Sequence, residues 1–123
     1  MTTVAVVFGV IGGLVHVGVW LAESVFWSRE RVWRTFGARS AEEAAIQSGV
    51  FYNIGFYNLF VGLGAIVGAT TLARSDSAVL LSYAAAFMLG AGVVLLSRNR
   101  ELWRGALAQI LPGAVVLIAL VVR

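Results

Sequence analysis

The sequence of 123 residues has no cysteine and no lysine, and only one histidine and one proline. Without cysteine, the chain can form no disulfide and offers no thiolate to a metal or a haem. A single histidine leaves too few nitrogen ligands for a transition-metal site, so we expect no metal and no cofactor. Charge is also scarce, because charged residues make up only 12% of the chain. A soluble domain usually has about 25%, so this deficit favours a membrane protein.

Hydrophobic residues make up 60% of the chain and are gathered in four long runs. About 20 apolar residues in a helix cross a hydrocarbon core of roughly 30 Å. The runs therefore predict an all-α, polytopic membrane protein, a four-transmembrane-helix bundle with short loops that forms a single domain over residues 1–123. The expected helices are at about 3–27, 41–72, 78–97 and 103–122.

All nine basic residues are arginines, and their distribution is uneven. Seven lie in or beside the first and third loops, compared with Arg74 in the second loop and Arg123 at the C-terminus. Arginine-rich loops stay in the cytoplasm. We therefore expect a protein of the bacterial inner (plasma) membrane, with loops 1 and 3 in the cytoplasm and both termini outside. This topology explains the basic residues, so we expect no nucleic acid partner.

The first loop contains SRERVWRTFG, in which arginines alternate with apolar side chains. This pattern is typical of a short helix in the cytoplasmic membrane interface that closes at Gly37, and equally of a solvated loop. Ser40 and Glu43 have the spacing of a capping box. The second membrane helix should therefore begin near Ala41.

The first apolar run carries the only histidine, His16, and a carboxylate, Glu23, seven residues later. At about 100° per residue, these two side chains share one helix face with Trp20 and Trp27. Ionisable side chains in a membrane helix are costly, so they usually face the bundle interior and have a partner. His16 and Glu23 are roughly 10 Å apart along the helix axis, which is too far for direct contact.

The second run is the most polar of the four. Asn53 and Tyr57 share one face, and Asn58 lies on another face among small residues. Counting residues from the cytoplasmic ends of the helices puts Asn58 at the depth of His16, and Asn53 at the depth of Glu23.

Gln109 in the fourth run falls at a comparable depth, three residues before Pro112. That proline removes a backbone hydrogen bond and should kink the helix. These polar side chains predict a pocket in the cytoplasmic half of the bundle that binds, and could transport, a small molecule or lipid. The predicted ligand-binding residues are His16, Trp20, Glu23, Asn53, Tyr57, Asn58 and Gln109.

Each polar group also has a structural interpretation. Glu23 could form an ion pair with Arg29, Arg31 or Arg104 and fix the helix ends. A neutral His16 could form a hydrogen bond with an amide or a tyrosine of the second run. An enzyme that uses His16 and Glu23 as an acid–base pair is the least favoured alternative, because no nucleophile, metal site or phosphate loop accompanies them.

Gly55 and Gly62 lie in a stripe of small residues that would let two helices approach closely. This stripe favours the main alternative function, a structural or accessory membrane subunit that acts through helix contacts and has no ligand. A small bundle encloses little volume, so we also expect a homodimer, which is parallel because the charge bias orients every copy alike.

Three motifs stand out: His16 ahead of the E-x-x-x-W that ends at Trp27, the block N-I-G-F-Y-N at 53–58, and the Q-x-x-P that begins at Gln109. They resemble motifs of a family of small four-helix bacterial and fungal membrane proteins, catalogued as domain of unknown function 1304. The likeness covers essentially the whole chain. Ile54 stands where the family usually has glutamine. The resemblance implies a four-helix membrane fold and marks important positions, without an established activity.

Overall fold

The computed structural model describes residues 1–123 and contains helices and no strands. Four of its helical segments are long and apolar enough to cross a membrane. The predicted all-α, four-helix fold is therefore confirmed. The elements are α1 (Thr2–Trp20), a π-helix (Leu21–Val25) that continues it, α2 (Glu30–Thr35), α3 (Ala41–Ser75), α4 (Val79–Arg98), a 3₁₀ turn (Arg100–Leu102) and α5 (Trp103–Val121).

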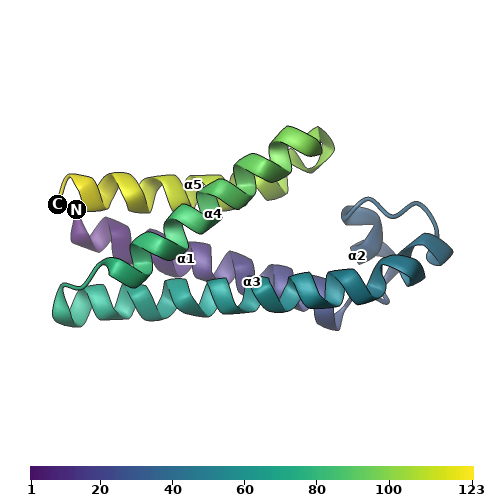
Figure 1. Cartoon of the computed structure of the whole chain (residues 1–123), viewed down its shortest axis with the longest axis horizontal. Coiled ribbons are helices and arrows are strands. Elements are labelled where there is room, and N and C mark those ends of the chain that lie inside the picture. The colour runs from purple at the N-terminus through teal and green to yellow at the C-terminus, as the bar shows by residue number, and fades with distance from the viewer.

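The long helices form two antiparallel pairs (Figure 1). Helix α1 packs along α3, and α4 packs along α5, while α1 also contacts α5 and α3 contacts α4. Both termini lie at one end of the molecule, and α2 lies at the opposite end beside the start of α3. The α4–α5 pair diverges from the α1–α3 pair toward the end that carries α2. That end is therefore built by α1, α2 and α3.

Small residues bring the helices close together in the core. The main core cluster has ten buried residues, of which six are alanines. A Cβ on Gly9 would lie 2.7 Å from the side chain of Leu81 in α4. A Cβ on Gly12 would lie 2.8 Å from Met88 in α4 and 3.1 Å from Pro112 in α5. Helix α5 continues through Pro112, which is buried against α1.

The small-residue stripe of α3 faces α1. Gly55 and Gly62 are both buried. A Cβ on Gly62 would lie 2.7 Å from the carbonyl oxygen of Gly13, and a Cβ on Gly55 would overlap the side chain of Ser24. The contacts on which the accessory-subunit hypothesis depended are thus made within one chain.

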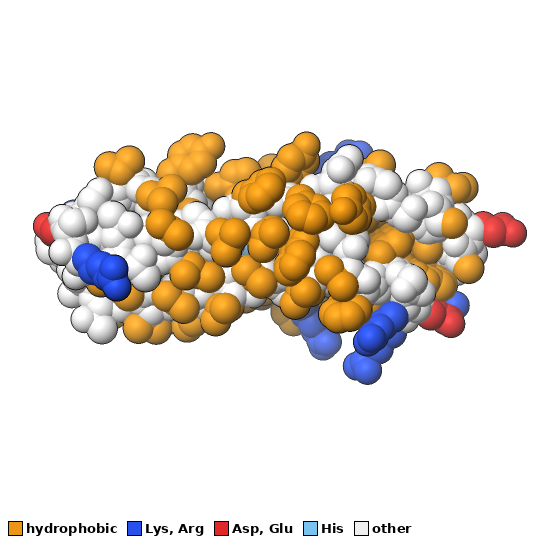
Figure 2. Space-filling view, turned by 90° about the horizontal axis from the view of Figure 1, so that it is seen from below, with side chains coloured by type: hydrophobic (Ala, Val, Ile, Leu, Met, Phe, Trp, Pro, Cys, Tyr) orange, Lys and Arg blue, Asp and Glu red, His pale blue; other side chains and the backbone are white.

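The outer surface separates apolar from charged side chains (Figure 2). Hydrophobic side chains run along most of the face shown, and charged side chains lie near its left tip and around the edge of its right half. The exposed hydrophobic residues include Leu14, Phe60 and Val67 of the long helices. Apolar exteriors of this kind belong against lipid, so the surface and the four apolar helices together indicate a membrane protein.

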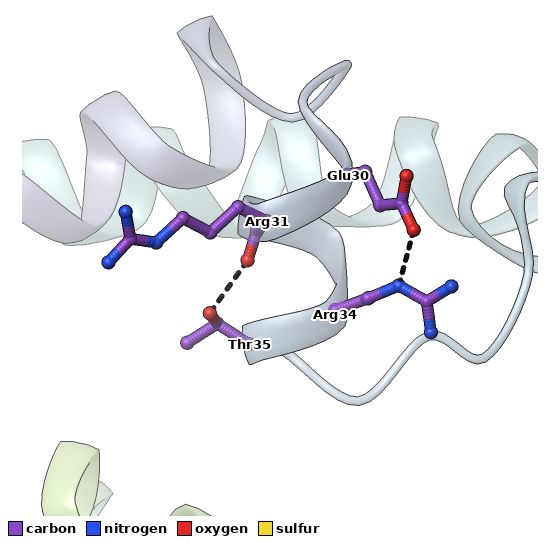
Figure 3. Close-up of polar contacts among 4 residues, drawn as sticks. All are labelled: Glu30, Arg31, Arg34 and Thr35. Atoms are coloured by element: carbon purple, nitrogen blue, oxygen red, sulfur yellow. Dashed lines mark hydrogen bonds and ion pairs between the residues drawn. The ribbon is translucent and has the colours of Figure 1, made fainter.

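The first loop folds into the short helix α2 rather than a solvated loop, and it closes at Gly37, whose φ is +96°. Figure 3 shows its polar contacts: Arg34 Nε donates to Glu30 Oε1 at 2.7 Å, and Thr35 Oγ1 donates to the carbonyl of Arg31 at 2.8 Å. Both contacts lie within α2. Arg31 and Arg34 are both exposed, so the arginines of this helix are on its outer side.

The predicted cap at the start of α3 is present. Ser40 Oγ accepts from the backbone N–H of Glu43 at 3.1 Å. Glu43 Oε2 accepts from the backbone N–H of Arg39 at 2.8 Å, one residue before the cap, so the reciprocal bond is shifted by one position. At its other end, α3 closes at Asp76, which has a left-handed conformation with φ 57°.

Candidate functional site: a cavity beside a buried hydrogen-bond chain

Helix α1 changes its winding just before it ends. From Leu21 to Val25 it is a π-helix, in which the N–H of Phe26 donates to the carbonyl of Leu21 at 2.8 Å. Such turns hold one extra residue, are rare and often occur at functional sites. Glu23 lies in the middle of this segment and is only 4% exposed. The extra residue changes the angular positions of the side chains within and after the turn. It therefore helps to set the directions in which Glu23 and Trp27 face.

Glu23 belongs to a chain of hydrogen bonds that joins α1 to α3. Asn58 Nδ2 donates to Glu23 Oε2 at 3.1 Å and also to the carbonyl of Ile54 at 3.1 Å. On the other side, His16 Nδ1 lies 2.8 Å from Asn58 Oδ1. A carbonyl can only accept, so the Ile54 contact identifies Nδ2 and leaves Oδ1 facing His16. His16 Nδ1 therefore carries the proton and donates it to Asn58.

The bond between His16 and Asn58 is one of the contacts that the sequence offered for His16, and it places the two residues level in the bundle, as the residue count predicted. Asn58 also solves the spacing problem in α1, because its two ends reach two side chains that cannot touch each other. No arginine forms an ion pair with Glu23, since the ion pairs of the chain are Arg34–Glu30 and Arg123–Asp76. The structural interpretation that paired Glu23 with a loop arginine is therefore wrong.

Two buried polar atoms near this chain have no hydrogen-bond partner: His16 Nε2 and Trp20 Nε1. The ring of Trp20 packs edge-on against Phe56, with centroids 6.1 Å apart. Unpaired buried polar groups are uncommon, and each costs stability. The contact between α1 and α3 at His16 and Trp20 is therefore less fully hydrogen-bonded than the contact at Glu23, about one turn beyond Trp20.

A cavity of about 710 Å³, open to the surface along the exposed first turns of α3, lies between the end of α1, α2 and α3. Trp27, Trp33 and Tyr52 line it together with alanines and serines. Glu23 is the only acidic or basic residue in its wall. The site is thus a mainly apolar cavity with one carboxyl group.

Two hydrogen bonds hold the walls in register. Ser24 Oγ donates to the carbonyl of Tyr52 at 2.9 Å, and Trp27 Nε1 donates to the carbonyl of Ala44 at 2.9 Å. Because α1 and α3 are antiparallel, Glu23 and Tyr52 are the lining residues furthest from α2 along these two helices, at the inner end of the cavity. Trp27 and Trp33, 8% and 7% exposed, are buried side chains of this region rather than free surface groups.

The seven predicted site residues do not all converge. His16, Asn58 and Glu23 form the hydrogen-bond chain, and only Glu23 lines the cavity. Tyr57 is 64% exposed, outside the cavity. Asn53 is also exposed on α3, and Gln109 Nε2 donates to the carbonyl of Gly105 in its own helix at 3.3 Å. Trp20 lies beside the chain without a hydrogen bond.

Several residues that shape the cavity were not among those predicted. Trp27 and Trp33 come from the junction and from α2, and Gly49 and Tyr52 from α3. The available signal was the run of small residues AEEAAIQSG at the start of α3, which leaves space beside the two tryptophans. No group of three or more His, Cys, Asp or Glu side chains could hold a metal ion.

A family model described as protein of unknown function (DUF1304) matches residues 10–121 of this chain. The match includes α3, α4, α5 and α1 from Val10 onward, together with the hydrogen-bond chain and the whole cavity. No curated protein and no solved structure matches this chain.

Proposed function

The chain belongs to this family of unknown function, DUF1304, and from its own residues we propose that it binds a small amphipathic molecule or lipid in the cavity beside Glu23. The observation that carries the proposal is the combination of a mainly apolar cavity of about 710 Å³ with a single carboxyl group in its wall. Small-molecule sites are typically about 300–1,000 Å³ and mostly apolar, with few polar groups that orient the ligand.

Asn58 supports this proposal because it holds the carboxyl group in place. Its Nδ2 is anchored by the carbonyl of Ile54 in its own helix, so the donor that reaches Glu23 has a fixed position. Because such a polar group is already held in place by rigid helices, less conformational entropy is lost when a ligand binds to it.

The uneven distribution of the arginines also supports a location for the cavity in the membrane. Loops 1 and 3 carry most of the arginines, so in the inner membrane the cavity end would face the cytoplasm and both termini would lie outside. A ligand would then reach the cavity from the cytoplasm or from the inner leaflet. We propose binding rather than transport, because beyond Glu23 the bundle is closed by the fully buried His16 and the alanine-rich core.

The test uses two glycines of α3 that have open space around them. A Cβ at Gly49 or at Gly64 would meet no heavy atom within 4 Å, but only Gly49 lines the cavity. Gly49→Leu should fill the cavity without disturbing the fold, and Gly64→Leu is its matched control. Native mass spectrometry of protein extracted in mild detergent should show a reproducible non-detergent adduct in wild type and Gly64→Leu, and none in Gly49→Leu. An adduct that persists in Gly49→Leu, or no adduct in wild type, would overturn the proposal.

We also propose a parallel homodimer that forms across the outer face of α3. Asn53, Tyr57 and Phe60 are exposed on this helix, and neither Asn53 nor Tyr57 makes a side-chain hydrogen bond within the chain. Polar groups that face lipid are unfavourable, and a second copy in the same orientation would let them pair across a twofold axis. The same mass spectra should show twice the protomer mass, reduced to one protomer by Tyr57→Ala. A protomer mass for wild type would contradict the dimer.

A further inference from the structure

We infer that the cavity beside Glu23 takes a cationic amphiphile, whose ammonium head lies at the Glu23 carboxylate and whose apolar body lies along the aromatic and alanine walls. This inference rests on the proposed function, because it names the chemical class of the ligand for the same cavity.

Charge is the first observation behind the inference. Glu23 is the only acidic or basic residue that lines the cavity, and it has no ion-pair partner. Its one hydrogen bond comes from the neutral amide of Asn58. A carboxylate in an apolar wall without a cation is unfavourable, so a positive group that arrives with a ligand gains a strong interaction there.

Two of the nearby arginines contact other groups. The guanidinium of Arg29 lies over the ring of Phe26, 4.5 Å from its centroid. Arg34 is paired with Glu30 and lies 5.0 Å from the ring centroid of Trp33. None of these arginines lines the cavity, so they neither neutralise Glu23 nor offer a charge partner to an anion inside it. A carboxylate or phosphate head in the cavity would meet only a like charge.

The aromatic walls point the same way. Trp27, Trp33 and Tyr52 all line the cavity that Glu23 closes at its inner end. Aromatic rings attract ammonium groups through the negative potential of their faces, and quaternary ammonium ligands are commonly bound by such rings. The stack of Trp27 on Phe51, with centroids 4.2 Å apart, fixes one of these rings.

The test compares three probes of equal chain length: decyltrimethylammonium, 1-decanol and decanoate. Each is titrated against the full chain in neutral maltoside micelles, with tryptophan fluorescence as the readout, because Trp27 and Trp33 line the cavity. The variants are Glu23→Gln, Gly49→Leu and, as a control for charge alone, Glu101→Gln, which changes an exposed glutamate outside the cavity. Micelle partition is the same for every variant, so comparison with wild type removes it.

We expect decyltrimethylammonium to bind wild type about tenfold more tightly than it binds Glu23→Gln, which corresponds to about 1.4 kcal/mol. 1-Decanol should bind these two proteins equally, and Glu101→Gln should bind decyltrimethylammonium like wild type. Gly49→Leu should abolish binding of both probes, and it tests occupancy of the cavity even if Glu23→Gln fails to fold.

The possible failures are distinguishable. Equal binding of decyltrimethylammonium to wild type and Glu23→Gln, or decanoate binding that Glu23→Gln weakens, would overturn the cationic ligand and leave the proposed binding function intact. If Gly49→Leu weakens the binding of none of the probes, the proposed function is overturned, and the cationic ligand with it.

Discussion

Gly13 of α1 and Gly62 of α3 meet backbone to backbone. A Cβ on Gly62 would lie 2.7 Å from the carbonyl oxygen of Gly13, and a Cβ on Gly13 would lie 2.8 Å from the carbonyl oxygen of Gly62. His16 and Asn58 follow within about one turn on the same two helices and are hydrogen-bonded at 2.8 Å. The two glycines therefore set the helix separation at which this hydrogen bond forms.

Gly62→Ala should destabilise the protein by about 1–3 kcal/mol, because the added methyl group meets a backbone atom that cannot move away. Gly64→Ala is the control, since its Cβ meets nothing within 4 Å. It should be neutral or stabilising by up to about 1 kcal/mol, as alanine favours a helix over glycine. Reversible unfolding in mixed maltoside and dodecyl sulfate micelles, followed by circular dichroism, measures both. Equal stabilities for the two variants would show that the close approach is not limiting.

Asn58→Ala should cost about 1–3 kcal/mol, since it leaves both His16 Nδ1 and the Glu23 carboxyl group buried without their partner. Asn53→Ala changes the same residue type in the same helix where the side chain is exposed and makes no hydrogen bond, so it should stay within about 0.5 kcal/mol of wild type. The same unfolding assay compares them. If Asn58→Ala proved as stable as Asn53→Ala, the hydrogen-bond chain would contribute nothing to the fold.

Asp76 combines a left-handed backbone, φ 57°, with an ion pair to Arg123 at 2.7 Å. Asp76→Ala and Asp76→Gly both remove the ion pair, but only glycine adopts this conformation without strain. The glycine variant should therefore be more stable than the alanine variant by about 1 kcal/mol. Thermal unfolding of both variants measures the difference. Equal melting temperatures would mean that the backbone at this turn relaxes freely.

The chain has no cysteine, so single introduced cysteines can report its orientation without background. In intact bacteria, Ser77→Cys in the second loop should react with a membrane-impermeant maleimide. Glu101→Cys in the third loop should react only after the membrane is opened, and this change keeps all the arginines that set the orientation. The reverse pattern would overturn the proposed topology.

Much of the fold could be predicted because each segment carries its own signal. Apolar runs of sufficient length marked the four helices, and the Ser40 cap located the start of α3. Counting residues from the helix ends put Asn58 level with His16, but the sequence left the partner of His16 open between this amide and a tyrosine, and the structure shows the amide.

The cavity could not be predicted in this way. The π-helix at Leu21–Val25 depends on how α1 docks on its neighbours, and no residue in LAESV demands it. The burial of Trp27 and Trp33 depends on α2 packing back on α3, which is a tertiary event. Tyr57 shares a helix with Asn58, yet its side chain points outward, because the helix face that meets α1 is chosen by the glycines.

The distance in sequence between His16 and Asn58 has a consequence for biosynthesis. The two residues are 42 positions apart, and roughly 5–20 residues are added to a growing chain per second. The first helix therefore emerges about 2–8 seconds before the amide that will satisfy its histidine and its glutamate. During that interval, the apolar part of the helix, in which an 18-residue window has a mean hydropathy of 2.2, must be enough to keep two unpartnered polar side chains in the bilayer. Insertion of α1 and completion of its polar contacts are thus separate events during synthesis.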